Sequence, residues 1–273
     1  MNKQKRRVLL AAAVGAAVLL LLAWDTRLQI TEHVIGTDRV EKPVRLAILT
    51  DLHSCAYGDG QEELLAAVDA LGPDAVLLGG DILDDRLPEA NAWRTVSVLA
   101  EKYPCAYVTG NHEWWSGEAE RMCTQMESLG VAVLRGESVV WTLNGQSVTI
   151  CGVDDPDSGE DQLAAAAAGA GESGFTVLLA HRPEQVDSYL RYPFDLIVSG
   201  HAHGGQWRVP GLVNGLYAPH QGVFPRYAGG RYDFDGSVLL VSRGLAREST
   251  RIPRLFNRPE LMLAEIVPSA EAK

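Results

Sequence analysis

The chain has 273 residues, enough for one large α/β domain with a sizeable core or for two small domains. Hydrophobic residues make up 47% and charged residues 22% of the sequence, as is ordinary for a globular protein. The formal net charge of −11 argues against a protein that binds nucleic acid through a broad basic surface, so nucleic acid is not an expected partner.

The first 24 residues form a segment apart from the rest of the chain. Residues 1–7 (MNKQKRR) are strongly basic, and residues 8–24 (VLLAAAVGAAVLLLLAW) carry no charge and are at the short end for a membrane span. No small-x-small cleavage site follows, so we expect an uncleaved anchor, with a cleaved signal peptide as the alternative. Arg6-Arg7 also permits twin-arginine export. The basic end favours a single-pass protein of the cell membrane, with a cytoplasmic N-terminus and everything after Trp24 outside the cytoplasm.

Residues 25–42 form a polar connector, in which the alternation around LQITEHV suggests an edge strand. Beyond it we expect one domain over residues 43–268, because no internal linker is long enough to mark a second. Short β-rich runs there alternate with helical patterns at 61–72 and 89–103. The strand-like runs are 44–50, 74–80, 105–110, 147–153, 175–180, 194–200 and 237–243. This alternation predicts an α/β domain with layered sheets.

Polar side chains gather at the carboxyl ends of these runs, where open α/β sheets bind their ligands. Five of the seven histidines lie there, and His33 and His220 are the exceptions. Each residue alone has an ordinary explanation as a helix cap, a turn residue or a buried histidine. Together they would leave a cluster of polar groups without partners at one rim, which a pair of metal ions would satisfy. The residues are Asp51, His53, Asp81, Asn111, His112, His181, His201 and His203.

Imidazole and carboxylate ligands suit Zn, Fe, Mn, Co or Ni, and the absence of thiolate ligands disfavours a structural zinc site. Two metals about 3.5–4 Å apart need a bridging carboxylate. Alternate residues of an extended chain point the same way, so one DxH or HxH segment can serve one metal twice or two metals once each.

The four cysteines, at positions 55, 105, 123 and 151, leave disulfides open in a chain expected outside the cytoplasm. They lack CxxC spacing, and Cys105 and Cys151 lie in apolar strand-like runs. Buried free thiols are therefore the preferred interpretation.

Five segments resemble the motifs of the calcineurin-like metallophosphoesterases: DLH (51–53), GD (80–81), GNHE (110–113), His181 and GHAH (200–203). The resemblance covers about residues 44–265, and GHAHGGQ, APHQGVFPRY, VSRGL and RIPRLFNRPEL resemble the bacterial membrane-associated branch. It implies a four-layer α/β/β/α sandwich with two mixed sheets, with the site at the sheet ends.

The resemblance also implies a role for each residue. Asp51, His53 and His203 would hold a first metal and Asp81 would bridge. A second metal would be held by Asn111, His181 and His201, while His112 would contact substrate rather than metal.

The expected function is a dinuclear phosphoesterase using two divalent ions, with Mn, Fe or Zn favoured. A hydroxide held by both metals would attack phosphorus in line, and His112 would protonate the departing alkoxide. The expected substrate is a phosphodiester. A membrane-bound one, such as a lipid headgroup or a lipid-linked envelope precursor, is preferred, with a small soluble ester as the alternative. A catalytically spent, membrane-tethered binding protein is disfavoured because no ligand position is lost, and a nuclease because no basic channel is evident. The arginines at 243, 247, 251, 254 and 258 are either a phosphate or headgroup site or a solvated rim.

Overall fold

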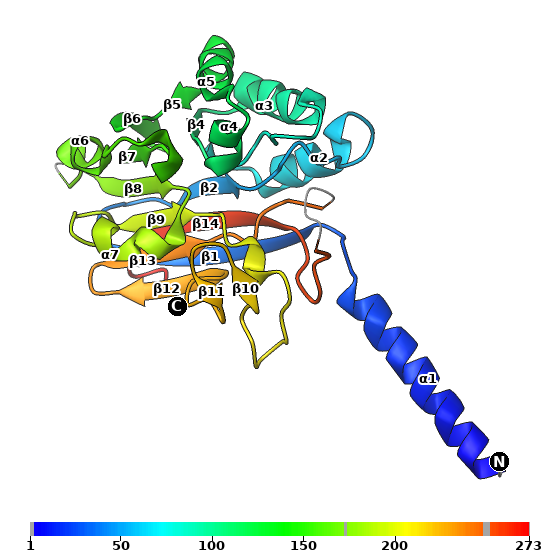
Figure 1. Cartoon of the computed structure of the whole chain (residues 1–273). Coiled ribbons are helices and arrows are strands. Elements are labelled where there is room, and N and C mark those ends of the chain that lie inside the picture. Colours follow the sequence, from blue (N-terminus) through cyan, green and yellow to red (C-terminus); the bar gives the residue numbers. More distant parts are fainter. Residues whose placement is uncertain (1–2, 172–173, 248–251, 273) are drawn as a thin grey trace.

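The computed structural model describes residues 3–171, 174–247 and 252–272. Two six-stranded sheets lie face to face, with helices on their outer faces (Figure 1). Strands β2 to β5 of the first sheet are mutually parallel, and β14 runs antiparallel to β2 and parallel to the edge strand β1. The first sheet contains, in spatial order, β1 (Gln29–Thr37), β14 (Glu260–Pro268), β2 (Val44–Leu49), β3 (Ala75–Gly79), β4 (Cys105–Val108) and β5 (Ala132–Val133).

The second sheet has a parallel centre and antiparallel edges, because β12 and β6 each pair antiparallel with their neighbour. In spatial order it contains β12 (Gly230–Phe234), β13 (Ser237–Val241), β9 (Leu196–Ser199), β8 (Phe175–Ala180), β7 (Gln146–Val153) and β6 (Glu137–Leu143). A small separate ribbon is formed by β10 (Tyr217–Ala218) and β11 (Gly222–Val223).

The α-helices are α1 (Lys3–Ala23), α2 (Glu62–Leu71), α3 (Ala90–Lys102), α4 (Asn111–Trp115), α5 (Ala119–Ser128), α6 (Leu163–Ala166) and α7 (Val186–Tyr189). Short 3₁₀ turns are η1 (Asp59–Gln61), η2 (Pro156–Ser158), η3 (Ala167–Gly169), η4 (Pro183–Gln185) and η5 (His203–Gly205). Helices α2, α3 and α5 share an apolar core with the outer face of the first sheet, and α6 and α7 do so with the second.

Strand β2 shows how the sequence builds these layers. Leu46 and Ile48 point into the core between the two sheets, whereas Ala47 and Leu49 point into the core beneath the helices. Because side chains alternate along a strand, a strand buried on both faces must be apolar at every position. Three apolar cores separate four layers, which confirms the expected α/β/β/α sandwich with two mixed sheets.

All seven strand-like runs and both helical patterns are found, within a few residues of the expected bounds. The edge strand expected near LQITEHV is β1, which pairs along its whole length with β14. The four cysteines are buried and form no disulfide, as the preferred interpretation held. Burial raises the pKa of the Cys105 and Cys123 thiols to about 12.

Helix α1 extends away from the body of the molecule (Figure 1). Its described large apolar side chains are exposed, and they include Leu9, Leu10, Val14, Val18, Leu21 and Leu22. Over the described ranges, no helix has both the length and the apolar character needed to cross a bilayer. The membrane anchor therefore stays a prediction.

Candidate metal centre

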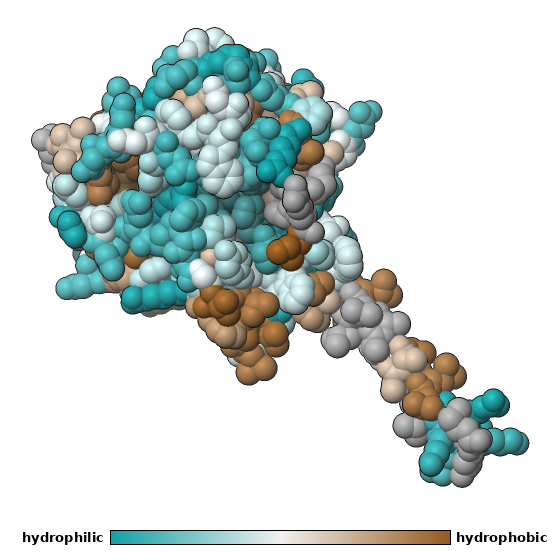
Figure 2. Space-filling model, viewed as in Figure 1, coloured by the Kyte–Doolittle hydropathy of each residue, from teal (hydrophilic) through white to brown (hydrophobic). Residues whose placement is uncertain are grey.

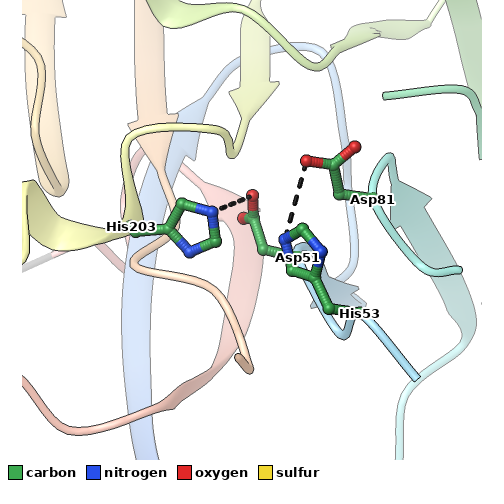
Figure 3. Close-up of side chains that lie close together, drawn as sticks. All are labelled: Asp51, His53, Asp81 and His203. Atoms are coloured by element: carbon green, nitrogen blue, oxygen red, sulfur yellow. Dashed lines mark ion pairs between the residues drawn. The ribbon is translucent and has the colours of Figure 1, made fainter. Parts of the chain in front are cut away.

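The expected ligand residues meet at one rim formed by both sheets. Asp51 and His53 follow β2, Asp81 follows β3 and Asn111 follows β4, while His181 follows β8 and the His201–His203 pair follows β9. Figure 3 shows Asp51, His53, Asp81 and His203 turned toward one another. His53 Nε2 lies 3.6 Å from Asp81 Oδ2, and His203 Nε2 lies 3.7 Å from Asp51 Oδ1.

Two groups of ligand-type atoms share Asp81. One group contains Asp51, His53, Asp81 and His203, and the other contains Asp81, His181 and His201. Within each group the atoms lie within 4.8 Å of one another, and all of these residues are buried. A carboxylate common to two such groups is the arrangement that a metal pair requires.

Several buried polar atoms at the rim have no hydrogen-bond partner among the described residues. A buried polar atom without a partner is energetically unfavourable, so these atoms indicate a binding site for a cation. A divalent ion fits this donor set of imidazole nitrogens and carboxylate and amide oxygens. The atoms are Asp51 Oδ2, His53 Nε2, Asp81 Oδ2, Asn111 Oδ1 and His181 Nε2.

The backbone at the rim is strained. Left-handed φ angles at non-glycine residues cost about 1–3 kcal/mol each and persist only where the surroundings impose them. A methyl group at Gly244 would lie 2.5 Å from Cβ of Asp51, so this neighbour must be glycine for the loops to close. The residues with these angles are Asp51 (49°), His53 (47°), Asp81 (52°), His201 (63°) and His203 (47°). Such clustering is typical of a functional site.

Neighbouring groups orient the histidines. His181 Nδ1 lies 2.8 Å from the Gly79 carbonyl and donates to it, and His53 Nδ1 lies 3.0 Å from Asp84 Oδ2. Each contact fixes the proton on Nδ1 and leaves the Nε2 lone pair facing the rim. Burial lowers the pKa of His201 and His203 well below the ordinary value, so both rings stay neutral, the form that binds metal.

Charges at the rim are strongly interdependent. Burial and the Asp81 charge raise the pKa of Glu113 to about 7, although Glu113 accepts backbone hydrogen bonds from Asp81, Leu83 and Gly110 at 2.8–3.0 Å. Burial opposes protonation of His181, yet the Asp81 carboxylate, 3.2 Å away, raises its pKa to about 10. A buried site with this attraction for positive charge favours metal binding in place of the proton.

His112 lies in the first turn of α4, beside the rim and outside the two groups that share Asp81. Its Nδ1 lies 2.7 Å from Asp85 Oδ1, and its ring packs edge-on against His53 at 4.4 Å between centroids. The side chain remains 22% exposed, so it can reach a molecule bound at the rim.

Sequence reasoning missed His220. We set it aside as an exception, but its Nδ1 lies 3.0 Å from His201 Nε2. Arg182 Nη1 lies 2.7 Å from the same His220 nitrogen, and Arg182 forms a two-point ion pair with buried Asp155. The guanidinium argues against a further cation beside His220. No strand end marks this residue, and its one sequence signal was the segment APHQGVFPRY (218–227), whose resemblance assigned no role to the histidine. His33 lies on edge strand β1.

Sequence reasoning also missed Asp84 and Asp85. They lie shortly after Asp81, and a run of acidic residues after a strand does not reveal which of them contacts His53 or His112.

The described arginines of the final segment have protein partners. Arg243 pairs with Glu260 at 2.8 Å, and buried Arg254 donates to the Arg243 and Gly244 carbonyls. Arg247 pairs with Glu63, and Arg258 donates to the carbonyls of residues 27 and 28. The nearly buried Arg243 and the buried Arg254 are therefore structural, and Arg251 lies outside the described residues.

The chain is similar in sequence to known proteins. A family model described as calcineurin-like phosphoesterase matches residues 44–205. Phosphodiesterase YaeI of Escherichia coli is 31% identical over 234 residues, covering 82% of this chain and 83% of that protein. Protein YpbG of Bacillus subtilis is 26% identical over 253 residues, covering 92% of this chain and 91% of that protein. A metallophosphoesterase of Helicobacter pylori is 32% identical over 189 residues, and the chain spans about half the length of that relative (66% of this chain, 50% of that protein).

Solved structures share the fold. The 5'-nucleotidase precursor of Thermus thermophilus superposes with a TM-score of 0.51 at 16% identity, covering 84% of this chain and 55% of that one. The NAD nucleotidase of Haemophilus influenzae superposes with a TM-score of 0.51 at 16% identity, covering 74% of this chain and 50% of that one. The family model spans more than half of the chain, and the rim residues supply a donor set that suits divalent metal. This chain belongs to the calcineurin-like phosphoesterase family and is a metal-dependent phosphohydrolase.

Proposed function

We propose that the chain hydrolyses a phosphodiester with the help of two divalent ions bound at the rim. The observation that carries this proposal is the pair of buried ligand groups that share Asp81. Their unpartnered nitrogen and oxygen atoms support a dinuclear site rather than a structural cluster.

Each residue has a defined part in the proposed site. Asp51, His53 and His203 would hold one ion, and Asn111, His181 and His201 the other, with Asp81 common to both. The ions would supply Lewis acidity, activating water and offsetting negative charge on the phosphoryl oxygens. Mn, Fe and Zn all suit these ligands.

His112 would serve as the general acid. Its Nδ1–H donates to Asp85, so Nε2 is the atom that would carry the proton for the leaving oxygen. The partly exposed ring beside the buried ligands is placed as this role requires.

The substrate and location are part of the same proposal. The relative YaeI is named a phosphodiesterase, which supports a diester. We place α1 in the membrane with its basic end in the cytoplasm, because the apolar side chains described along it are exposed. A membrane-bound phosphoester, such as a lipid headgroup or lipid-linked envelope precursor, is then the favoured substrate.

The test is an activity panel on the purified full chain. Phosphomonoesters, phosphodiesters and lipid phosphoesters would each be assayed after metal removal and addition of Mn, Fe, Zn or Mg. We expect metal-dependent turnover of a diester, with two metal equivalents bound per chain. Activity that survives chelation, or saturation at one equivalent, would contradict the dinuclear proposal.

A further inference from the structure

The segment from Gln206 to Arg226, which we call the apolar lobe, exposes a cluster of large apolar side chains. Leu212 is 85% and Phe224 66% exposed, and Val209, Tyr217 and Val223 are about half exposed or more. Figure 2 shows this cluster as a brown protrusion on the side of the body from which α1 extends. Apolar patches of this kind on an otherwise polar surface mark interaction sites.

The exposure of the lobe is built into the fold. Phe224 N donates to Leu216 O at 2.8 Å, and Leu216 N donates to Gly205 O at 2.9 Å, so the lobe is tied to the turn that carries His203. Phe224 has a φ of 56°, an unfavourable conformation for an aromatic residue. A strained backbone at a residue whose aromatic ring is exposed to solvent indicates a functional interaction surface.

The lobe and the end of α1 are held by the same short segment. Phe256 N donates to Ala23 O at 2.7 Å, and Arg208 N donates to Leu255 O at 3.0 Å. Trp207 Nε1 donates to Pro253 O at 2.9 Å. Exposed Trp207 therefore contacts this segment, and exposed Trp24 directly follows Ala23, which the segment binds. Tryptophan favours the boundary between lipid and water.

The charge of the lobe differs from that of the whole chain. Residues 206–226 contain two arginines and no carboxylate, although the chain has a net charge of −11. Apolar side chains flanked by arginine and tryptophan suit a bilayer surface with anionic lipids better than a second copy of this acidic chain.

We propose that the apolar lobe docks on the bilayer surface beside α1 and holds the metal centre toward the lipid. The same lobe carries His220 next to His201, so one loop forms a wall of the metal centre and a membrane contact. This inference rests on the proposed placement of α1 in the membrane.

The test places a polarity-sensitive dye on Leu212→Cys of the full chain, mixed with vesicles of phosphatidylcholine and phosphatidylglycerol. Val140→Cys is the matched control, because Val140 is also an exposed apolar residue (62%) but lies on β6, at the edge of the second sheet opposite β12. The native cysteines are buried. We expect a blue shift and quenching by lipid-borne nitroxides at 212 and neither at 140.

Three outcomes would overturn the docking proposal. The first is identical behaviour at 212 and 140 while the chain floats with the vesicles, which would leave α1 as the membrane contact. The second is a blue shift at 212 without vesicles that grows with protein concentration, which would identify a second copy as the occupant. The third is a chain that does not float, which would reject the anchor as well.

A second measurement links docking to turnover. The double variant Leu212→Ser, Phe224→Ser should lower the rate of hydrolysis of a phosphoester in vesicles by roughly tenfold or more, because each change removes an apolar contact with lipid. The rate on a soluble ester should be unchanged. Val140→Ser is the control. An equal effect on both substrates would contradict docking. If the unaltered chain turned over neither the phosphoester in vesicles nor the soluble ester, the proposed phosphodiester hydrolysis would be rejected instead, and the dye measurement would still test docking.

Discussion

Asp81 is the residue on which both ligand groups depend. Asp81→Asn should abolish turnover and weaken binding of both metals, because a neutral amide cannot hold two cations as a carboxylate does. Metal content per chain would be measured by elemental analysis beside Asp233→Asn, a change at an exposed carboxylate on β12. Two full equivalents with unaltered activity would reject the bridging role.

The role proposed for His112 is separable from metal binding. His112→Ala should retain the metals but lose roughly 10²–10⁴-fold in rate on esters with poor leaving groups, the scale of general acid catalysis. The loss should shrink with p-nitrophenol, which departs with little protonation. Steady-state rates of the variant on both substrate types would test this role. Equal losses in rate on the two types would show that His112 is not the general acid.

We expect His220 to act as a positioning residue through its contact with His201. His220→Ala should weaken the second metal by roughly 10–100-fold, the usual effect of removing a group that orients a ligand histidine. Competition with a chelating dye would give the two metal affinities separately. The first metal should bind as before, and equal weakening of both would indicate general disruption of the rim.

At the scale of elements, β14 offers two carboxylates in different surroundings. Glu260 and Arg243 are both nearly buried, whereas Glu265 and Arg45 are partly exposed. Glu260→Gln should destabilise the fold by about 3–5 kcal/mol, because Arg243 would keep a buried charge without its partner. Glu265→Gln should cost only about 0–1 kcal/mol. Denaturant unfolding of both variants would compare them, and similar values would contradict the role of burial.

The Glu260–Arg243 pair should make the stability of the fold depend on pH. Burial opposes ionisation of Glu260, but Arg243 lowers its pKa below the ordinary 4.5. A lowered carboxyl pKa stabilises the folded state above the unfolded pKa, and this stability is lost as the pH falls through the folded pKa. The free energy of unfolding, measured at decreasing pH from pH 6, should therefore decrease once the pH is below about 4.5. In the Glu260→Gln variant this decrease should be less steep.

The strands that carry the motifs were predictable because the residue pattern of each one is contiguous in the sequence. Runs such as 44–50 and 175–180 are apolar at successive positions, and the polar residue that ends each run marks the sheet edge. Strand β14 was not anticipated, although it lies between β1 and β2 in the finished sheet. Its partners are more than two hundred residues away along the chain, and no local pattern records such a pairing.

At the scale of the whole molecule, the orientation of α1 would determine which side of the membrane the domain occupies. With α1 inserted and its basic end inside, the domain should be cleaved by protease added to intact cells. A cytoplasmic marker protein must stay intact in the same sample. Protection of the domain from protease until the cells are lysed would overturn the topology.

The sequence by itself determined the layered α/β class and the residues at the rim. Asp51, His53, Asp81, Asn111, His181, His201 and His203 each follow an expected strand, so their convergence could be inferred from the shared direction of parallel strands. The family motifs then supplied the division into two ligand groups.

Only the tertiary structure decided which further groups contact that rim. His220 contacts His201, Arg243 pairs with Glu260, and Arg254 is buried. It also placed the apolar lobe beside the end of α1 through residues 253–256. These contacts join segments remote along the chain, and they follow from how loops pack after the sheets have formed, which local periodicity does not encode.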